Sequence, residues 1–221
     1  MSMDYISESN LSYLNMMKDI YEVSLACNTK TYIWGGFTVD ILEGKFLREH
    51  GDLDGFVENM MALLDDLKSE YESKGYEVDF INDINMLTIR KGDQHAAFNP
   101  LDVNENVAMW RHIGDQGTVY FPYSWLDNAP REFYNTYVYT SGINFEYGFR
   151  KIVHLLNPEW KVREKDRVSL EYFQNKIIEK GINEKDILSC IWSFSPFWIK
   201  KRYSPFDKPT LVWPMYNRSQ I

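Results

Sequence analysis

The stretch that decides the fold runs from residue 35 to residue 54 and reads Gly-Gly-Phe-Thr-Val-Asp-Ile-Leu-Glu-Gly-Lys-Phe-Leu-Arg-Glu-His-Gly-Asp-Leu-Asp. A β-prone run, residues 31–34, leads into the glycine pair Gly35-Gly36, and residues 37–43 read as a short helix that Gly44 ends. Two glycines at a helix N-terminus leave backbone N–H groups accessible to an approaching phosphate. The sequence therefore predicts a phosphate-binding turn between a strand and a helix.

Two carboxylates follow on the next predicted strand, residues 52–57. Asp52 and Asp54 are two residues apart, and such residues point to the same face of a strand, about 6.6 Å apart along the backbone. Mg²⁺ commonly binds through one or two carboxylates together with substrate phosphates. The turn and the carboxylates together predict a phosphate-handling metal site with Asp52 and Asp54 as its ligands.

Composition and charge limit the class of protein. The chain has 221 residues, of which 44% are hydrophobic and 16% aromatic, as expected for one large or two small globular domains. The formal net charge of −8 argues against broad binding to nucleic acid. No apolar run reaches the roughly 18 residues of a membrane helix, and the first ten residues lack the features of a secretion signal. We expect a soluble, cytoplasmic protein with no membrane partner.

The remaining pattern predicts an α+β fold. Helical spacing of apolar residues predicts an N-terminal amphipathic helix whose apolar stripe is Leu11, Leu14, Met17, Tyr21 and Leu25. Further strands are expected at 76–80, 86–90, 94–101, 107–112, 118–121 and 137–139, and helices at 60–71, 144–157, 164–180 and 183–194. We expect a mixed-sheet core at residues 1–142 and a helical C-terminal region at 143–221, which ends in an irregular aromatic tail.

The residues of the deciding stretch resemble a known family. The order of glycine pair, helix and Asp-x-Asp is similar to the nucleotidyltransferase superfamily that includes DNA polymerase β, and within it to the aminoglycoside and lincosamide nucleotidyltransferases. A weaker similarity lies at residues 163–167, Arg-Glu-Lys-Asp-Arg, which several relatives carry at the start of a C-terminal helix. The matching residues are Gly35, Gly36, Phe37, Val39, Asp40, Gly44, Arg48, His50, Asp52 and Asp54.

The resemblance implies an activity: transfer of a nucleoside monophosphate, AMP in the first instance, from a nucleoside triphosphate such as ATP to a hydroxyl of a small molecule. Asp52 and Asp54 would hold Mg²⁺, and Gly35 and Gly36 would bind the phosphates. Arg48 or Lys165 would neutralise charge on the triphosphate, because positioning and charge neutralisation dominate phosphoryl transfer. His50 would contact phosphate or orient a carboxylate. The acidic balance is compatible with a cationic, aminoglycoside-like acceptor.

One position departs from the family pattern. Relatives carry a third acidic residue on a later strand, and the corresponding run here is Ala97-Phe98-Asn99-Pro100, so Ala97 occupies the place of that carboxylate. The third carboxylate completes the metal site or acts as general base, and a general base contributes about 10²- to 10⁴-fold in rate. Asp79 and Asp102 are the candidates to substitute for it, although neither has the expected register.

Two other functions remain open from the sequence. A catalytically silent nucleotidyltransferase fold that binds nucleotide or a protein partner is favoured by Ala97 and Asn99. A nucleotidyltransferase that modifies tRNA is opposed by the net charge but would use the basic run at residues 200–202. The sequence indicates neither the acceptor nor the oligomeric state.

Overall fold

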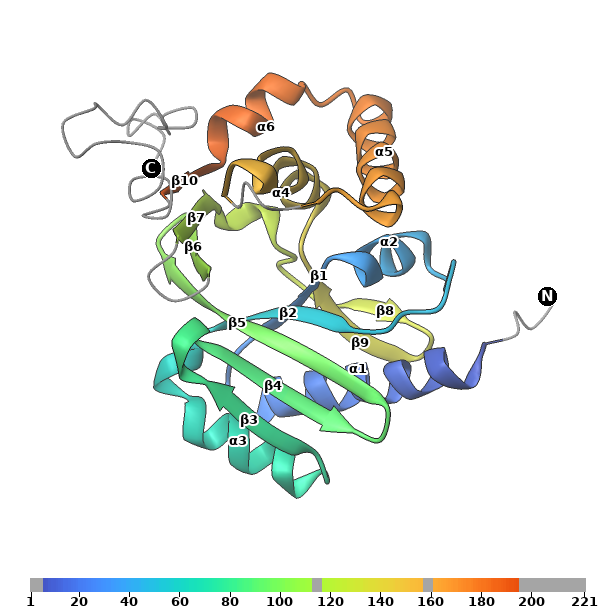
Figure 1. The fold of residues 1–221 in the computed structure, drawn as a ribbon, viewed down its shortest axis with the longest axis vertical. Helices are drawn as coiled ribbons and strands as arrows, with labels where there is room; N and C mark the ends of the chain where they lie inside the picture. The colour runs from blue at the N-terminus through green and yellow to red at the C-terminus, as the bar shows by residue number, and fades with distance from the viewer. Residues whose placement is uncertain (1–5, 113–116, 157–160, 195–221) are drawn as a thin grey trace. The chain divides into compact units, whose positions relative to one another are not determined.

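The computed structural model describes residues 6–112, 117–156 and 161–194 (Figure 1). Backbone contacts divide the chain into two compact units. Unit one consists of Met1–Ile81, Met86–Pro100 and Asp127–Thr140, and unit two of Asn82–Asn85, Leu101–Leu126 and Ser141–Ile221. These contacts divide the chain at several points, whereas the sequence suggested one boundary near residue 142. Residues 1–142 as a separate domain therefore stay a prediction.

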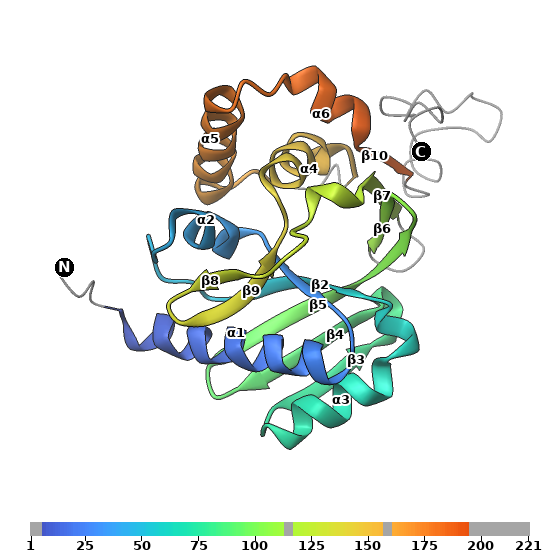
Figure 2. The same ribbon diagram turned by 180° about the vertical axis from the view of Figure 1, so that it is seen from behind.

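Unit one is an α+β layer built on a mixed sheet. The spatial order of its strands is β3-β4-β5-β2-β1-β9-β8, in which β1 pairs with β9 in parallel and with β2 antiparallel. Helices α1 and α3 cover one face of this sheet (Figures 1 and 2). The elements are α1 Glu8–Ala26, β1 Thr31–Trp34, α2 Gly36–Glu43, β2 Leu53–Glu58, η1 Met60–Ala62, α3 Leu64–Ser73, β3 Glu77–Ile81, β4 Met86–Lys91, β5 Gln94–Asn104, β8 Arg131–Phe133 and β9 Thr136–Thr140.

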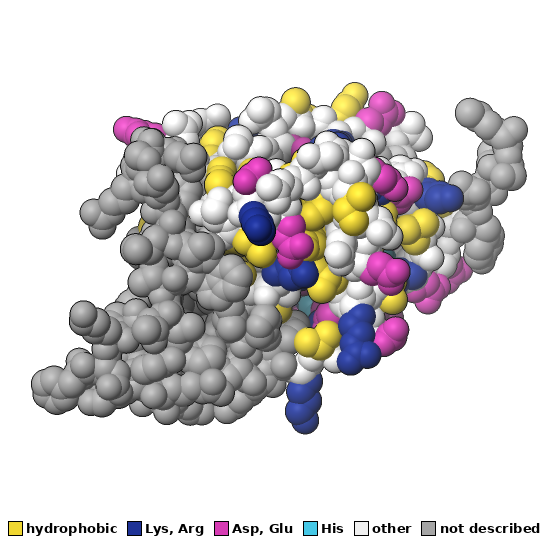
Figure 3. All heavy atoms as spheres, turned by 90° about the horizontal axis from the view of Figure 1, so that it is seen from above, with side chains coloured by type: hydrophobic (Ala, Val, Ile, Leu, Met, Phe, Trp, Pro, Cys, Tyr) yellow, Lys and Arg dark blue, Asp and Glu magenta, His cyan; other side chains and the backbone are white. Residues whose placement is uncertain are grey.

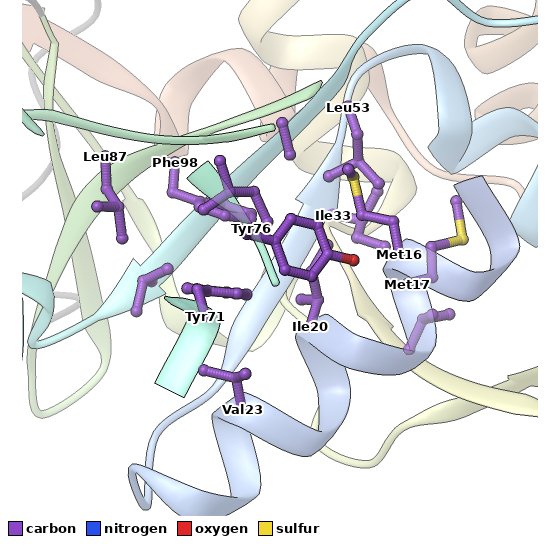
Figure 4. Close-up of a cluster of buried hydrophobic side chains, with 14 of the residues drawn as sticks. Met16, Met17, Ile20, Val23, Ile33, Leu53, Tyr71, Tyr76, Leu87 and Phe98 are labelled. Atoms are coloured by element: carbon purple, nitrogen blue, oxygen red, sulfur yellow. The ribbon is translucent and has the colours of Figure 1, made fainter. Parts of the chain in front are cut away.

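The core of unit one lies between the sheet and the two helices. Figure 4 shows α1 side chains such as Met16 and Ile20 gathered with Ile33 and Leu53 of the strands. Tyr71 of α3 stacks on Phe98 of β5 with ring centroids 5.8 Å apart, and both rings are fully buried. Burial of each such side chain contributes roughly 1.5–3 kcal/mol, so this cluster is the main support of the strands.

The buried face of α1 differs from the predicted stripe. Leu11 and Leu25 are 48% and 60% exposed, whereas Met17 is buried as expected. The helix instead buries a neighbouring stripe, whose Tyr13 packs on Phe37 of α2. That stripe consists of Asn10, Tyr13, Met16, Met17, Ile20, Val23 and Ser24.

Unit two combines antiparallel strands with the C-terminal helices. The last residues of β5 pair with β6, β6 with β7, and β7 with β10. An aromatic cluster of Trp110, Phe121, Phe145 and Phe149 joins these strands to α4, with centroid separations of 4.6–6.4 Å. The elements are η2 Asn82–Ile84, β6 Val107–His112, β7 Gly117–Pro122, η4 Tyr123–Trp125, α4 Ile143–Leu156, α5 Glu164–Glu179, α6 Glu184–Cys190 and β10 Trp192–Phe194.

Of two expectations for the C-terminal region, one is corrected and the other concerns residues outside the described ranges. The helix expected at 183–194 ends at Cys190, and residues 192–194 form β10 because they pair with β7. The tail beyond residue 194, with the basic run at 200–202, lies outside the described residues. Among the described residues, no helix has the length and apolar character that a membrane span requires.

The two cysteines differ in environment. Cys27 lies in the unit-one core, and burial, followed by the negative charges of Glu70 and Asp66, raises the pKa of its thiol. Cys190 at the end of α6 is only half-buried. Both are free thiols.

Candidate nucleotide and metal site

The glycine pair forms a sharp turn from β1 into α2, as the sequence predicts. Gly35 has φ +86° and ψ −134°, a conformation that residues with a side chain rarely adopt. As the residue that precedes α2, Gly35 supplies no side-chain acceptor to the first helical turn. Anions are favoured at such a helix end, because its N–H groups point outward and its dipole is positive.

The two predicted metal ligands lie at the start of β2. Strand β2 begins at Leu53, so Asp54 is its second residue and Asp52 precedes it; the strand expected from residue 52 starts one residue later. Asp54 pairs with Trp34 across the strands. A Cβ added to Gly35 would lie 3.5 Å from Asp54 Oδ2, so this half-exposed carboxylate lies beside the glycine turn.

Asp52 is exposed and lies near α1. The pKa of Tyr13 is raised, first by burial and in smaller part by the negative charge of Asp52, while a hydrogen bond with the backbone of His95 opposes the rise. No group of three or more His, Cys, Asp or Glu side chains within the described ranges has the arrangement of a metal centre. Two carboxylates without a third protein ligand fit a Mg²⁺ ion that also binds nucleotide phosphates better than a cation held by protein alone.

Arg48 and His50 pack against the first residue of α2. A Cβ at Gly36 would overlap Nη2 of Arg48 and would lie 3.2 Å from Nδ1 of His50. The missing side chain of Gly36 therefore gives the Arg48 guanidinium and the His50 imidazole access to the helix N-terminus. Arg48 is an exposed residue, and its Nη1 donates to the carbonyl of Glu49 at 2.9 Å.

His50 contacts a carboxylate, that of Asp40. It lies in the irregular segment before β2 and not on the strand that carries Asp54. Its Nε2 lies 2.6 Å from Oδ2 of Asp40 in α2, and both side chains are almost completely buried. The imidazole also stacks on Phe37 at a centroid distance of 3.8 Å.

Ala97, which occupies the place of the family's third carboxylate, faces the same side of the sheet as Asp54. Strands β2 and β5 are neighbours, and Gly55 and Phe98 meet on the core side of the sheet. Because side chains alternate along a strand, Asp54 of β2 and Ala97 of β5 point to the opposite side. The half-exposed Asn99 shares that side with them.

The two proposed substitutes for the missing carboxylate occupy other places. Asp79 pairs with Thr88, which pairs with Ala97, so Asp79 lies two strand spacings, about 9.5 Å, from Ala97. Asp102 belongs to unit two and alternates to the side of β5 opposite Ala97. Neither residue has the register of Ala97, as the sequence indicated.

Lys165 belongs to unit two, where it is the exposed second residue of α5. The neighbouring Asp166 caps this helix by accepting a hydrogen bond from the backbone N–H of Arg163 at 2.9 Å. Burial raises the pKa of Asp166, but the hydrogen bonds and charge of Arg163 outweigh burial, and the pKa lies below its ordinary value. The Arg-Glu-Lys-Asp-Arg run is thus a capped helix start, and a nucleotide contact of Lys165 stays a prediction.

Two surface features complete the description. A hollow of about 350 Å³ beside α1 is lined by Ser12, Asn15, Met16, Asp19, Tyr76, Lys91 and Gln94, none of which is a predicted site residue. On the face shown in Figure 3, acidic and basic side chains of the described residues are interspersed. Among the described residues of that face, mixed charge of this kind leaves no continuous positive surface for a nucleic-acid backbone.

Sequence reasoning missed three residues near the site. Asn10 and Tyr13 reach it from α1, where Asn10 Nδ2 donates to the carbonyl of Arg48 at 3.1 Å and Tyr13 packs on Phe37. Trp34 lies opposite Asp54 and stacks on Phe56 at 5.2 Å. Trp34 directly precedes the glycine pair and was detectable from sequence, whereas no local pattern marks the other two.

Comparison with known proteins gives consistent findings. Residues 16–120 match the family model described as aminoglycoside-2''-adenylyltransferase. The solution structure of the antibiotic-resistance factor ANT(2'')-Ia superposes with a TM-score of 0.59 at 16% identity, covering 77% of this chain and 87% of that one. Its crystal structure with adenylyl-2''-tobramycin gives 0.58 at 17% identity, with 76% and 92% covered. No curated protein sequence matches the chain.

A lincosamide enzyme shares the same fold. The lincosamide antibiotic adenylyltransferase LnuA, bound to lincomycin, gives a TM-score of 0.53 at 15% identity and covers 77% of this chain and 98% of its own. The fold and the match over residues 16–120 are similar to the nucleotidyltransferase superfamily. The family model and these structures represent its aminoglycoside and lincosamide enzymes, so the resemblance seen in the sequence is confirmed.

Proposed function

We propose that the chain transfers AMP from ATP, with Mg²⁺, to a hydroxyl group of a small molecule. An aminoglycoside-like or lincosamide-like antibiotic is the acceptor to test first, because the similar proteins carry such antibiotics in their names and complexes. A cytoplasmic location is part of this proposal.

The observation that carries the proposal is the meeting of two features in unit one. The Asp54 carboxylate lies beside Gly35, at the turn where α2 presents its N-terminus. A triphosphate needs both features, because its oxygens accept from backbone N–H groups and its charge requires a cation nearby.

The protein groups have separate tasks in this reaction. Gly35 and Gly36 bind phosphate oxygens through the backbone, Arg48 neutralises their charge, and Asp52 and Asp54 would hold Mg²⁺. When bound, Mg²⁺ neutralises the charge that develops on the phosphates. The acceptor oxygen forms a bond to the α-phosphorus, the bond from this phosphorus to the β-bridging oxygen breaks, and pyrophosphate leaves with that electron pair. The hydroxyl proton passes to water, because Ala97 provides no base beside Asp54.

A second candidate function is a catalytically silent module that binds nucleotide or a partner. The alternation of side chains on β5 favours it, because Ala97 and Asn99 occupy the side of the sheet that carries Asp54. A site that lacks a base retains its phosphate turn and its two carboxylates. Nucleotide binding without measurable transfer would therefore agree with this alternative.

The first experiment is isothermal titration of ATP, GTP, CTP and UTP, each with Mg²⁺ and with EDTA. Mg²⁺-dependent binding of ATP supports the proposed site. No binding of any nucleotide would reject it, and with it the proposed transfer.

The second experiment separates the enzyme from the silent module. Pyrophosphate release is followed with aminoglycosides and lincosamides as acceptors, for the natural chain and for Ala97→Asp. We expect slow release that Ala97→Asp accelerates about 10²-fold, at the lower end of what a general base contributes. Binding of ATP with no release in either protein would favour the silent module.

A further inference from the structure

The segment between α2 and β2, residues 45–52, carries Arg48 and Asp52 but belongs to no helix or strand. Regular backbone hydrogen bonding therefore does not fix its course. Contacts with side chains of other elements must hold it, because buried backbone and charged groups need partners. We call this segment the site loop.

The strongest of these contacts joins His50 to Asp40. The 2.6 Å contact links the site loop to the middle of α2, ten residues earlier in the chain. The His50 and Asp40 side chains are 1% and 2% exposed. In such a dry environment, a hydrogen-bonded pair with a charged member is stronger than at the surface, and its loss leaves a buried polar group without its partner.

Aromatic packing restrains the ring of His50. Phe37, the second residue of α2, stacks on the imidazole at 3.8 Å with the two planes 21° apart. Tyr13 of α1 packs on Phe37 at 5.1 Å. The imidazole is thus fixed by a hydrogen bond to one residue of α2 and by stacking on another.

A second contact holds the loop from α1. Asn10 is 5% exposed, and its Nδ2 donates to the backbone carbonyl of Arg48. The buried His50 ring and the Arg48 guanidinium both lie against Gly36. Phe46 holds the start of the loop by packing on Phe133 and Tyr134. Contacts at Arg48 and His50 hold the part of the loop that lies beside the N-terminus of α2.

From these contacts we propose that Asp40 and His50 are positioning residues, assisted by Asn10, that hold Arg48 against the glycine turn and fix the course of the site loop as far as Asp52. The contact between α2 and the loop fixes the distance between the phosphate-binding and the metal-binding parts of the site. His50 is then not a ligand of phosphate or metal, and its effect on nucleotide binding acts through Arg48 and Asp52. The effect on binding rests on the proposed function, whereas the restraint on the loop does not.

Hydrogen exchange of the nucleotide-free protein tests the restraint. We expect His50→Ala to accelerate exchange of the amides of residues 40–50 about tenfold or more, because local opening no longer breaks the buried pair. His50→Gln, whose amide can still donate to Asp40, should exchange more slowly than His50→Ala. Unchanged exchange in His50→Ala would overturn the proposal.

Two further variants protect this test from a general loss of stability. Asp127→Ala removes another carboxylate of unit one, which accepts from Thr140 N at 3.0 Å and from Arg131 Nε at 2.7 Å. It should lower stability without changing exchange at residues 40–50. If His50→Ala fails to fold, Asp40→Asn keeps the side-chain size and weakens the contact, so the same comparison is made with it.

Titration of Mg-ATP tests the consequence for the site. We expect His50→Ala to weaken binding about 10- to 100-fold, as the loss of groups that orient metal ligands does, and His50→Gln to recover most of it. In a chain that already carries Arg48→Ala, the further loss caused by His50→Ala should be smaller than in the natural chain. Fully multiplicative losses would contradict an action through Arg48. If the natural chain binds no nucleotide, the proposed function fails while the exchange experiment still decides the restraint.

Discussion

Asp40 of unit one and Glu146 of unit two are both buried helical carboxylates, yet they join different parts of the chain. Asp40 pairs with His50, ten residues away in an irregular segment. Glu146 accepts from Ser141, just before its own helix α4, and from Arg150, one turn later in α4. The first pair links a helix to the site loop, whereas these contacts of Glu146 stay within α4 and Ser141 shortly before it. A buried carboxylate therefore stabilises the segment of the chain that carries its hydrogen-bond partner.

Breaking the pair of Glu146 and Arg150 should have the largest effect on stability. Glu146→Leu leaves the Arg150 guanidinium without its carboxylate partner and should lower the free energy of unfolding by about 3–5 kcal/mol in a urea titration. Adding Arg150→Met should restore much of this loss, because both charges are then gone. Mg-ATP affinity of the folded fraction should stay unchanged. A large change in affinity would show that the local pair also serves the site.

Substitution of the half-exposed Asp54 should show the reverse pattern, with a large effect on Mg-ATP binding and a small effect on stability. Asp54→Asn, and in the same way Asp52→Asn, should weaken Mg-ATP binding by more than about 100-fold, because a neutral amide is a poor Mg²⁺ ligand. The unfolding midpoint should hardly change. Asp79→Asn, an exposed residue of β3, is the matched control and should bind as the natural chain does. Unchanged Mg-ATP affinity in Asp54→Asn would reject the site.

Substitutions at the two glycines at opposite ends of α2 distinguish an effect on nucleotide binding from an effect on helix stability. Gly36→Ala places a methyl group against Arg48 and His50 and should weaken Mg-ATP binding about tenfold, by displacing the site loop. Gly44 has φ +70° and nothing within 4 Å of an added Cβ, so Gly44→Ala should cost about 1 kcal/mol of stability through backbone strain alone. Equal affinities of the two variants would contradict the crowding at Gly36.

The smallest effect is expected at the exposed start of α5. Because the pKa of Asp166 is lowered in the folded protein, its contribution is complete above the ordinary value of 3.8 and is lost as the pH falls through the lowered value. Asp166→Asn should cost less than about 1 kcal/mol at pH 6 and almost nothing at the acid end of this range. Urea titrations at several pH values measure this difference. A difference independent of pH would exclude the charge as its cause.

Local sequence was sufficient for the fold class and for the frame of the site. The glycine pair, the α2 helix and the order of Asp52 and Asp54 are all set by residues within twenty positions of one another. Backbone requirements at Gly35 and strand alternation at Asp54 act over such short distances, so their pattern is visible in the chain.

Features that depend on contacts between residues far apart in the sequence could not be predicted from local patterns. Helix α1 carries two adjacent stripes with apolar residues, and packing against the sheet selects Tyr13 and Met16 over Leu11 and Leu25. Residues 192–194 form a strand because β7 is available as a partner. His50 was predicted as a site residue, and its pairing with Asp40 depends on a loop whose course no local pattern indicates.

The contrast between the two cysteines has a practical consequence. The sequence contains two cysteines, and burial keeps the Cys27 thiol protonated and out of reach of reagents, while Cys190 is partly accessible. A maleimide dye at neutral pH should therefore attach at α6 of unit two without any engineered residue. Energy transfer from that dye to a fluorescent ATP analogue would then test whether the chain binds the nucleotide.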